Sequence, residues 1–367
     1  MLFVRADKLK AGMRLARPIY NKNGVLLYER NSKLSDQSII NVRNFGLIGL
    51  YVLEPAEPVP PMTMEDLAFE RFQTMEVFAI QEELTQMLQS KKPRKMEFIV
   101  ADILKNYGHM EKRVNFIQTL RSREDYIYKH VLNVAILATL MGHYLNMRPE
   151  DMSEIITAAI VHDIGKIEAK QGKYTNDEDQ DTDRKSRVKG FEWIENVFAS
   201  NPNIKRICVQ ASQMEEDFKA GVPTISKPVT GAKIMLIADL FDSMTAMQLD
   251  KEPASEITAL RTLLNNSKYF DSKIVDTLIH TITILDPGTC IELNTGEKGL
   301  VLTSNQVQIL HPMILVFRDN KIIDLSNREV YGDIEIKDIM KTMDNRHIMD
   351  TDFLKKQGIS VVEPEYV

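Results

Sequence analysis

Apolar residues recur at three- and four-residue spacing through the middle of the chain, from about residue 64 to residue 285. This period places apolar side chains on one face of a helix. The pattern predicts helices over the following ranges: 67–88, 99–108, 126–145, 152–165, 190–198, 232–247, 255–266 and 273–285. Gly165 is expected to end the fourth of these helices, because glycine readily adopts the backbone conformation of a helix terminus.

Short apolar runs separated by turn residues precede this helical stretch. Residues 18–34 are typical of a hairpin, with Asn23-Gly24 as its turn. A short helix follows, with Ser35 or Asp36 as its cap and Gly46 as its end. The next apolar run, at 47–54, predicts one more strand, so the first part of the chain forms a small strand-rich unit with one helix.

The last part of the chain returns to strand-like patterns. Two short runs lie about Gly296, and two more lie about Asp319-Asn320. The predicted fold is therefore mainly α, a multi-helix domain with a small α/β N-terminal unit and a small β C-terminal unit. Its parts are an N-terminal unit, a Pro-rich linker, a helical domain and a β-rich extension, at residues 1–53, 54–63, 64–286 and 287–367.

The composition describes an ordinary globular protein of 367 residues, with 44% hydrophobic and 27% charged residues. The net charge of −6 argues against a partner that is a nucleic-acid polymer, since such binding needs a basic surface. No apolar run reaches the roughly 18–20 residues of a membrane span, and no secretory signal is evident. With two cysteines, Cys208 and Cys290, the simplest location is the reducing cytoplasm.

Candidate metal ligands stand in three predicted helices. His162 and Asp163 are adjacent at the end of an apolar helix, His130 lies upstream, and Asp239 lies downstream. Imidazole nitrogens and carboxylate oxygens are ligands for a divalent transition metal. Lys166 follows Asp163 by three residues, so its ammonium group can neutralise phosphate charge at the same place.

Asp242 lies three residues after Asp239 and therefore shares its helix face. Three roles are open for Asp242: a partner that orients a metal ligand, a general base, or a carboxylate on the helix surface.

The order His130, His162-Asp163, Asp239 resembles the HD superfamily of metal-dependent phosphohydrolases. The segments LKAGMRLARPIY and DPGTCIEL, with GEKGLVL after the latter, extend the resemblance to the HD-GYP branch, which hydrolyses cyclic di-GMP. The resemblance implies an HD-type helical domain, an Fe or Mn cofactor and a role in bacterial cyclic-dinucleotide signalling. It also implies that Asp163 and Lys166 take part in catalysis.

The sequence departs from the HD-GYP pattern at the motif HHE…DGSGYP. The departing positions are Gln213 and Met214 for the two histidines, Phe218 for the aspartate, Val222 for the tyrosine, and Ser186 for a further histidine. No histidine lies between Asp163 and Ile279. An arginine-rich turn expected after residue 245 is also absent. We therefore expect a reduced site with one metal ion, and Glu215, the surviving letter of HHE, as a plain surface residue.

The acidic segment at residues 176–183 alternates aspartates as a calcium loop does. The sixth position of such a loop would be Thr182 instead of glycine, and the twelfth would be Val188 instead of glutamate. We therefore expect a solvated, mobile loop.

Three functions remain open at this stage. The first is a phosphohydrolase with one metal ion that acts on a phosphate ester, and the second is a cyclic di-GMP phosphodiesterase of weak or altered activity. The third is a catalytically inactive scaffold or nucleotide sensor, which binds a signalling protein or a nucleotide without cleaving it. An oligomer is compatible with each of them.

Overall fold

The computed structural model describes residues 2–21, 25–53, 63–116, 118, 121–170, 180–223, 227–247, 253–305 and 307–339. Several predictions from the sequence fall wholly or mostly outside these residues. They concern the turn at Asn23-Gly24, the Pro-rich linker at 54–63, the start of the acidic segment at 176–179, and the chain after residue 339.

The N-terminal unit, residues 2–53, is built from two small sheets and one helix. Its elements are β1 (Leu2–Arg5), β2 (Arg14–Leu15), β3 (Ile19–Tyr20), β4 (Leu26–Tyr28), α1 (Asp36–Asn44) and β5 (Gly49–Leu53). One sheet has the order β1-β5-β2, and β3 pairs with β4 in the other, with all pairs antiparallel. Ser35, one of the two predicted caps, caps α1 by accepting a hydrogen bond from the backbone N–H of Ser38.

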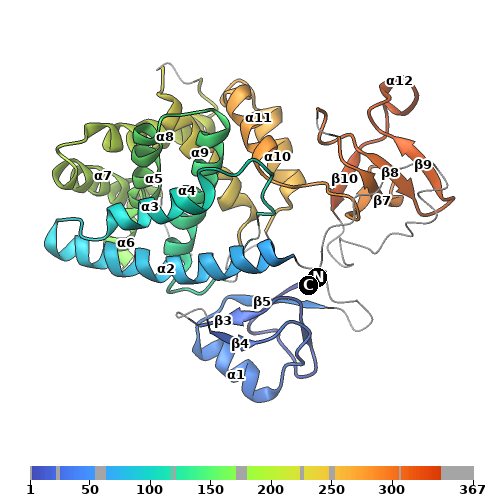
Figure 1. Ribbon diagram of the computed structural model, residues 1–367, viewed down its shortest axis with the longest axis horizontal. Helices are drawn as coiled ribbons and strands as arrows, with labels where there is room; N and C mark the ends of the chain where they lie inside the picture. The colour runs from blue at the N-terminus through green and yellow to red at the C-terminus, as the bar shows by residue number, and fades with distance from the viewer. Residues whose placement is uncertain are drawn as a thin grey trace.

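Helices make up the middle of the chain, as the apolar period predicted. They are α2 (Met64–Ser90), α3 (Met96–Tyr107), α4 (Tyr126–Tyr144), α5 (Pro149–Val161), α6 (Ile164–Lys170), α7 (Gln180–Val197), α8 (Pro202–Ala220), α9 (Thr230–Thr245), α10 (Glu256–Asn265) and α11 (Ser272–Thr281). Figure 1 shows α2 as a long helix along one side of this bundle, with the N-terminal unit next to it.

Helix α4 is the centre of the helical bundle. Its residues from Val131 to Gly142 are all buried and mostly apolar, so the helix is buried around its whole circumference over this stretch. A helix of this kind needs neighbours on every side, and α4 packs against α2, α3, α5, α9 and α11. Side chains that project from α4 toward α5 and α9 therefore lie in the interior of the domain.

A five-stranded antiparallel sheet of order β10-β6-β7-β8-β9 forms the C-terminal part (Figure 1). Its elements are β6 (Cys290–Leu293), β7 (Lys298–Thr303), β8 (Met313–Val316), β9 (Lys321–Asp324), the short α12 (Arg328–Tyr331) and β10 (Ile336–Ile339). The first four strands match the runs about Gly296 and Asp319-Asn320. The fifth, β10, was not predicted, and it pairs with β6 and contacts α10.

The predicted end of the fourth helix at Gly165 is wrong. Helix α5 ends at Val161, and Gly165 lies inside the next helix, α6. An added Cβ at Gly165 would lie 1.9 Å from the backbone oxygen of Ser186. Glycine is therefore required here for the close crossing of α6 and α7, and not for a helix end.

The prediction of a mobile loop over 176–183 is wrong for its described part. Residues 180–183 form the first turn of α7, and the side chain of Asp183 is 24% exposed and ion-paired. Helix α8 was not predicted from the sequence either. In the described part of the chain, no helix combines the length and the apolar character needed to cross a membrane.

Candidate metal centre

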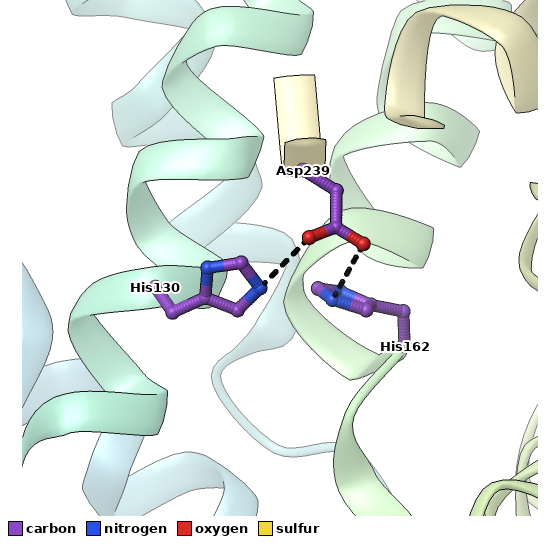
Figure 2. A group of neighbouring side chains, drawn as sticks. All are labelled: His130, His162 and Asp239. Carbon is purple, nitrogen blue, oxygen red and sulfur yellow. Dashed lines mark ion pairs between the residues drawn. The ribbon is translucent and has the colours of Figure 1, made fainter. Parts of the chain in front are cut away.

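Three predicted metal ligands converge between α4, the end of α5, and α9 (Figure 2). His130 Nε2 lies 3.3 Å from Asp239 Oδ1, and His162 Nε2 lies 3.9 Å from Asp239 Oδ2. One ligand atom from each residue lies within 4.8 Å of the others, which one ion can span after a small inward shift of the side chains. We refer to His130, His162 and Asp239 as the His-His-Asp trio.

The two ring nitrogens of His162 have different environments. Its Nδ1 lies 2.8 Å from the carbonyl oxygen of Ala159, one turn earlier in α5, and donates a hydrogen bond there. Its Nε2 is buried and has no hydrogen-bond partner among the described residues. A buried polar atom without a partner is costly, and a metal ion bound to the trio would satisfy it. The residues present therefore fit a divalent metal ion.

The ring of His130 is fixed from its other side by Asp242, whose Oδ2 lies 2.7 Å from His130 Nδ1. Asp242 is fully buried, which excludes the surface carboxylate that the sequence left open. Burial by itself lowers the pKa of His130, but the hydrogen bonds and charges of Asp239 and Asp242 outweigh it and raise the pKa to about 10. In the metal-free protein a proton on His130 thus balances the two carboxylates.

Asp163 lies beside the trio, with its carboxylate turned toward Lys166. Its Oδ1 lies 3.9 Å from His162 Nε2, whereas Lys166 Nζ lies 3.0 Å from the same oxygen. Burial raises the pKa of Asp163, but the positive charge of Lys166, with smaller contributions from the other basic groups around the site, outweighs it, so the pKa of Asp163 falls well below the usual range. Asp163 is consequently ionised, and it keeps Lys166 charged at the edge of the site.

Arg187 on α7 is a neighbour of the site that the sequence analysis missed. Its Nε donates to Asp183 at 3.0 Å, and its Nη1 donates to Glu215 on α8 at 2.5 Å. The prediction that Glu215 is a plain surface residue is therefore wrong, because its side chain is only 13% exposed and carries this ion pair. The four-residue spacing of Asp183 and Arg187 was the available signal, since such pairs meet on one helix face.

Most of the positions that were compared with the HD-GYP motif from the sequence serve packing in α7 and α8. Met214 and Ser186 are buried, and Phe218 packs against Tyr269 and Phe270. Val222 is 49% exposed after the end of α8.

A cavity of about 440 Å³ lies away from the trio, between the N-terminal unit, α2 and the start of α4. None of the predicted site residues lines it. Lys129, the neighbour of His130 in the chain, belongs to its wall.

Comparison with known proteins agrees with this geometry. Residues 127–244 match the model of the HD domain. The matched region runs from the first turn of α4 to the last turn of α9 and includes all of the predicted site residues. HD domains bind divalent metal ions, and the trio supplies suitable ligands within that region.

A cyclic di-GMP phosphodiesterase of Pseudomonas aeruginosa is 20% identical to this chain over 205 residues. The alignment covers 54% of this chain and 49% of the relative. The chain thus spans about half the length of that relative, which is a distant one.

Proposed function

We propose that this HD-domain protein is a cytoplasmic, metal-dependent phosphohydrolase with one divalent transition metal ion, Fe or Mn. Its substrate is a phosphate ester or a cyclic dinucleotide. The observation that carries the proposal is the convergence of the His-His-Asp trio around the buried Nε2 of His162, which has no hydrogen-bond partner in the described part of the chain. The HD-domain match and the distant phosphodiesterase relative support the same reaction class.

The trio, together with Asp163, would hold the ion. A bound ion of this kind polarises a phosphoryl oxygen and lowers the pKa of a coordinated water. Asp163 holds the Lys166 ammonium group 3.0 Å away, where this group can bind the negative charge of a phosphate. Lys166 is thus the proposed substrate-binding and charge-neutralising residue.

The finer assignment is an HD-GYP-like protein of bacterial cyclic-dinucleotide signalling with a degenerate motif. Gln213 and Met214 offer no imidazole ligand, and Met214 is buried in the core. Lys166 pairs with Asp163, and Arg187 pairs with Glu215. These two positive charges neutralise carboxylates near the trio that could otherwise attract a second cation. We therefore propose one ion and weak or altered phosphodiesterase activity.

A second candidate is a catalytically inactive scaffold or nucleotide sensor. It is favoured by the ion pairs that occupy Arg187, since Asp183 and Glu215 already neutralise a group that could bind phosphate. Such a protein would bind a nucleotide or a signalling protein without turnover.

The test combines metal analysis with assays of phosphate-ester and cyclic di-GMP hydrolysis. We expect about one Fe or Mn per chain, slow turnover, and loss of both in His162→Ala. The matched control is His143→Ala, because His143 lies on α4 outside the trio and is partly exposed. Metal binding without turnover of any substrate would favour the sensor. Absence of metal after loading with Mn²⁺ would reject the metal centre.

A further inference from the structure

A buried ion pair lies directly behind the metal ligand His130. Arg121 and Asp242 are both fully buried, and Arg121 Nη2 lies 2.7 Å from each carboxylate oxygen of Asp242. The guanidinium also lies over the ring of Tyr126, 4.8 Å from its centroid. Because Asp242 Oδ2 accepts the Nδ1 proton of His130, the position of this pair sets the direction of the imidazole ring.

Two amide side chains complete the environment of Asp242. Gln118 Nε2 lies 2.9 Å and Asn133 Nδ2 lies 2.7 Å from Asp242 Oδ1, and both donate to it. Each carboxylate oxygen therefore has more than one donor, which holds the carboxylate in one orientation. When a histidine binds a metal ion, such hydrogen-bond partners fix which ring nitrogen is protonated and how the ring is oriented.

The segment that carries Arg121 and Gln118 is held by the N-terminal unit. The backbone N–H of Ile48 donates to the carbonyl oxygen of Arg121 at 2.9 Å, and that of Arg123 donates to Gly46 at 3.2 Å. Arg17 Nη1 donates to the carbonyl oxygen of Gln118 at 3.2 Å. A short series of contacts thus joins the N-terminal unit to His130.

We propose that Arg121 is a positioning residue of the metal centre and that the N-terminal unit holds it in place. Arg121 is fully buried and acts on His130 through Asp242. The N-terminal unit, through Arg17 and residues 46–48, thereby sets the metal affinity of a site on another part of the chain. This inference rests on the proposed metal centre.

The test compares Arg121→Lys and Arg17→Met with the control Arg5→Met. Arg5 is an exposed arginine of the same unit and pairs with Asp7. Lysine keeps the charge at position 121, but it lacks the planar guanidinium that lies over the ring of Tyr126 and fixes the direction of Nη2 toward Asp242. We expect Arg121→Lys to lower Mn²⁺ affinity in calorimetric titration by about tenfold or more, Arg17→Met by about threefold, and Arg5→Met not at all.

A second readout needs no metal. In the metal-free protein the Nδ1 proton of His130, identified by its loss in His130→Gln, gives an imidazole signal in nitrogen-15 NMR. A residue that only supports the fold would leave this signal in place, whereas a positioning role shifts or broadens it in Arg121→Lys and Arg17→Met. If Arg121→Lys does not fold, Arg17→Met decides, since Arg17 lies outside the buried pair.

Wild-type affinity and an unchanged Nδ1 signal in the folded variants would overturn the inference. If the wild-type protein binds no Mn²⁺, the proposed metal centre fails, and the NMR signal alone then judges the role of Arg121.

Discussion

Buried carboxylates in this protein show opposite pKa shifts, depending on their partners. Asp242 is buried against Arg121 and His130, whose positive charges outweigh the effect of burial and lower its pKa. Glu76 on α2 is buried near Asp102, and burial together with that negative charge raises its pKa to about 7. One carboxylate is therefore ionised and orients the proposed metal ligand His130, while the other keeps its proton to higher pH.

This difference predicts a pH-dependent effect of Glu76→Gln. Between pH 4.5 and 7 the unfolded chain loses the Glu76 proton while the folded protein keeps it, so wild-type stability falls as pH rises. Glutamine does not titrate, so the stability of Glu76→Gln does not fall with pH for this reason. It should match the wild type near pH 4.5 and exceed it by on the order of 1–2 kcal/mol at pH 8, after allowance for solvent screening.

Urea unfolding at both pH values measures this effect. Glu82→Gln is the control, because Glu82 is an exposed carboxylate of the same helix, paired with Lys95. A stability difference between Glu76→Gln and wild type that does not change with pH would contradict the assignment.

At the scale of elements, the crossing of α6 and α7 depends on Gly165. A Cβ there would lie 1.9 Å from the Ser186 carbonyl oxygen and 3.0 Å from the backbone nitrogen of Gly190. Gly165→Ala should therefore force the helices apart and destabilise the protein by about 1–3 kcal/mol or more. The ion pair between Lys166 on α6 and Asp183 on α7 bridges this crossing and should loosen with it.

Thermal unfolding of Gly165→Ala beside Gly142→Ala measures this prediction. A Cβ at Gly142 in α4 meets its nearest atom, in Met152, at 3.4 Å, so alanine should be tolerated there and should favour the helix. Equal melting temperatures for the two variants would show that the α6–α7 crossing adjusts freely.

The sequence predicts elements well where one local pattern decides them. The apolar period of α4 and the serine cap of α1 are local, and both were found. Helix α8 was missed because its polar residues obscure the apolar face formed by Ile204, Ile207, Cys208, Ala211 and Met214. The burial of this apolar face depends on α5 and α9, against which α8 packs.

The trio was predictable because its residue types and order indicate metal binding by themselves. The contacts that orient the trio were only partly predictable from the sequence. Asp242 could be named from its spacing to Asp239, but Arg121 lies 121 residues from Asp242 in sequence, and only the fold brings the two together. Arg187 and Glu215 are likewise joined by packing between α7 and α8.

At the scale of the whole molecule, the N-terminal unit has an apolar core of its own. Its members are Val4, Leu9, Leu15, Ile19, Leu34, Ile39, Val42, Leu50 and Val52. A second core is continuous from the helical bundle into the C-terminal sheet, where it includes Ile291 and Val301. The trio lies in the part of the chain that shares this second core.

This arrangement predicts that metal binding stabilises one part of the molecule more than the other. At a free Mn²⁺ concentration 100 times the dissociation constant, binding adds about 2.7 kcal/mol to the folded state. For a cooperative unit of this size each kcal/mol raises the melting temperature by roughly 2–4 °C, so the helical part should melt about 5–10 °C higher. The melting temperature of the N-terminal core should rise much less, because that core contains no residue of the trio.

Scanning calorimetry with Mn²⁺, and again after excess chelator, measures these shifts. The chelator should reverse the stabilisation of the wild type, and His162→Ala should show no shift at any Mn²⁺ concentration. An equal shift in His162→Ala would mean that the ion binds elsewhere. A single transition that shifts as a whole would show that the N-terminal unit and the HD domain unfold as one body, because the contacts of Ile48 and Arg17 with the segment at Arg121 then hold them together throughout the transition.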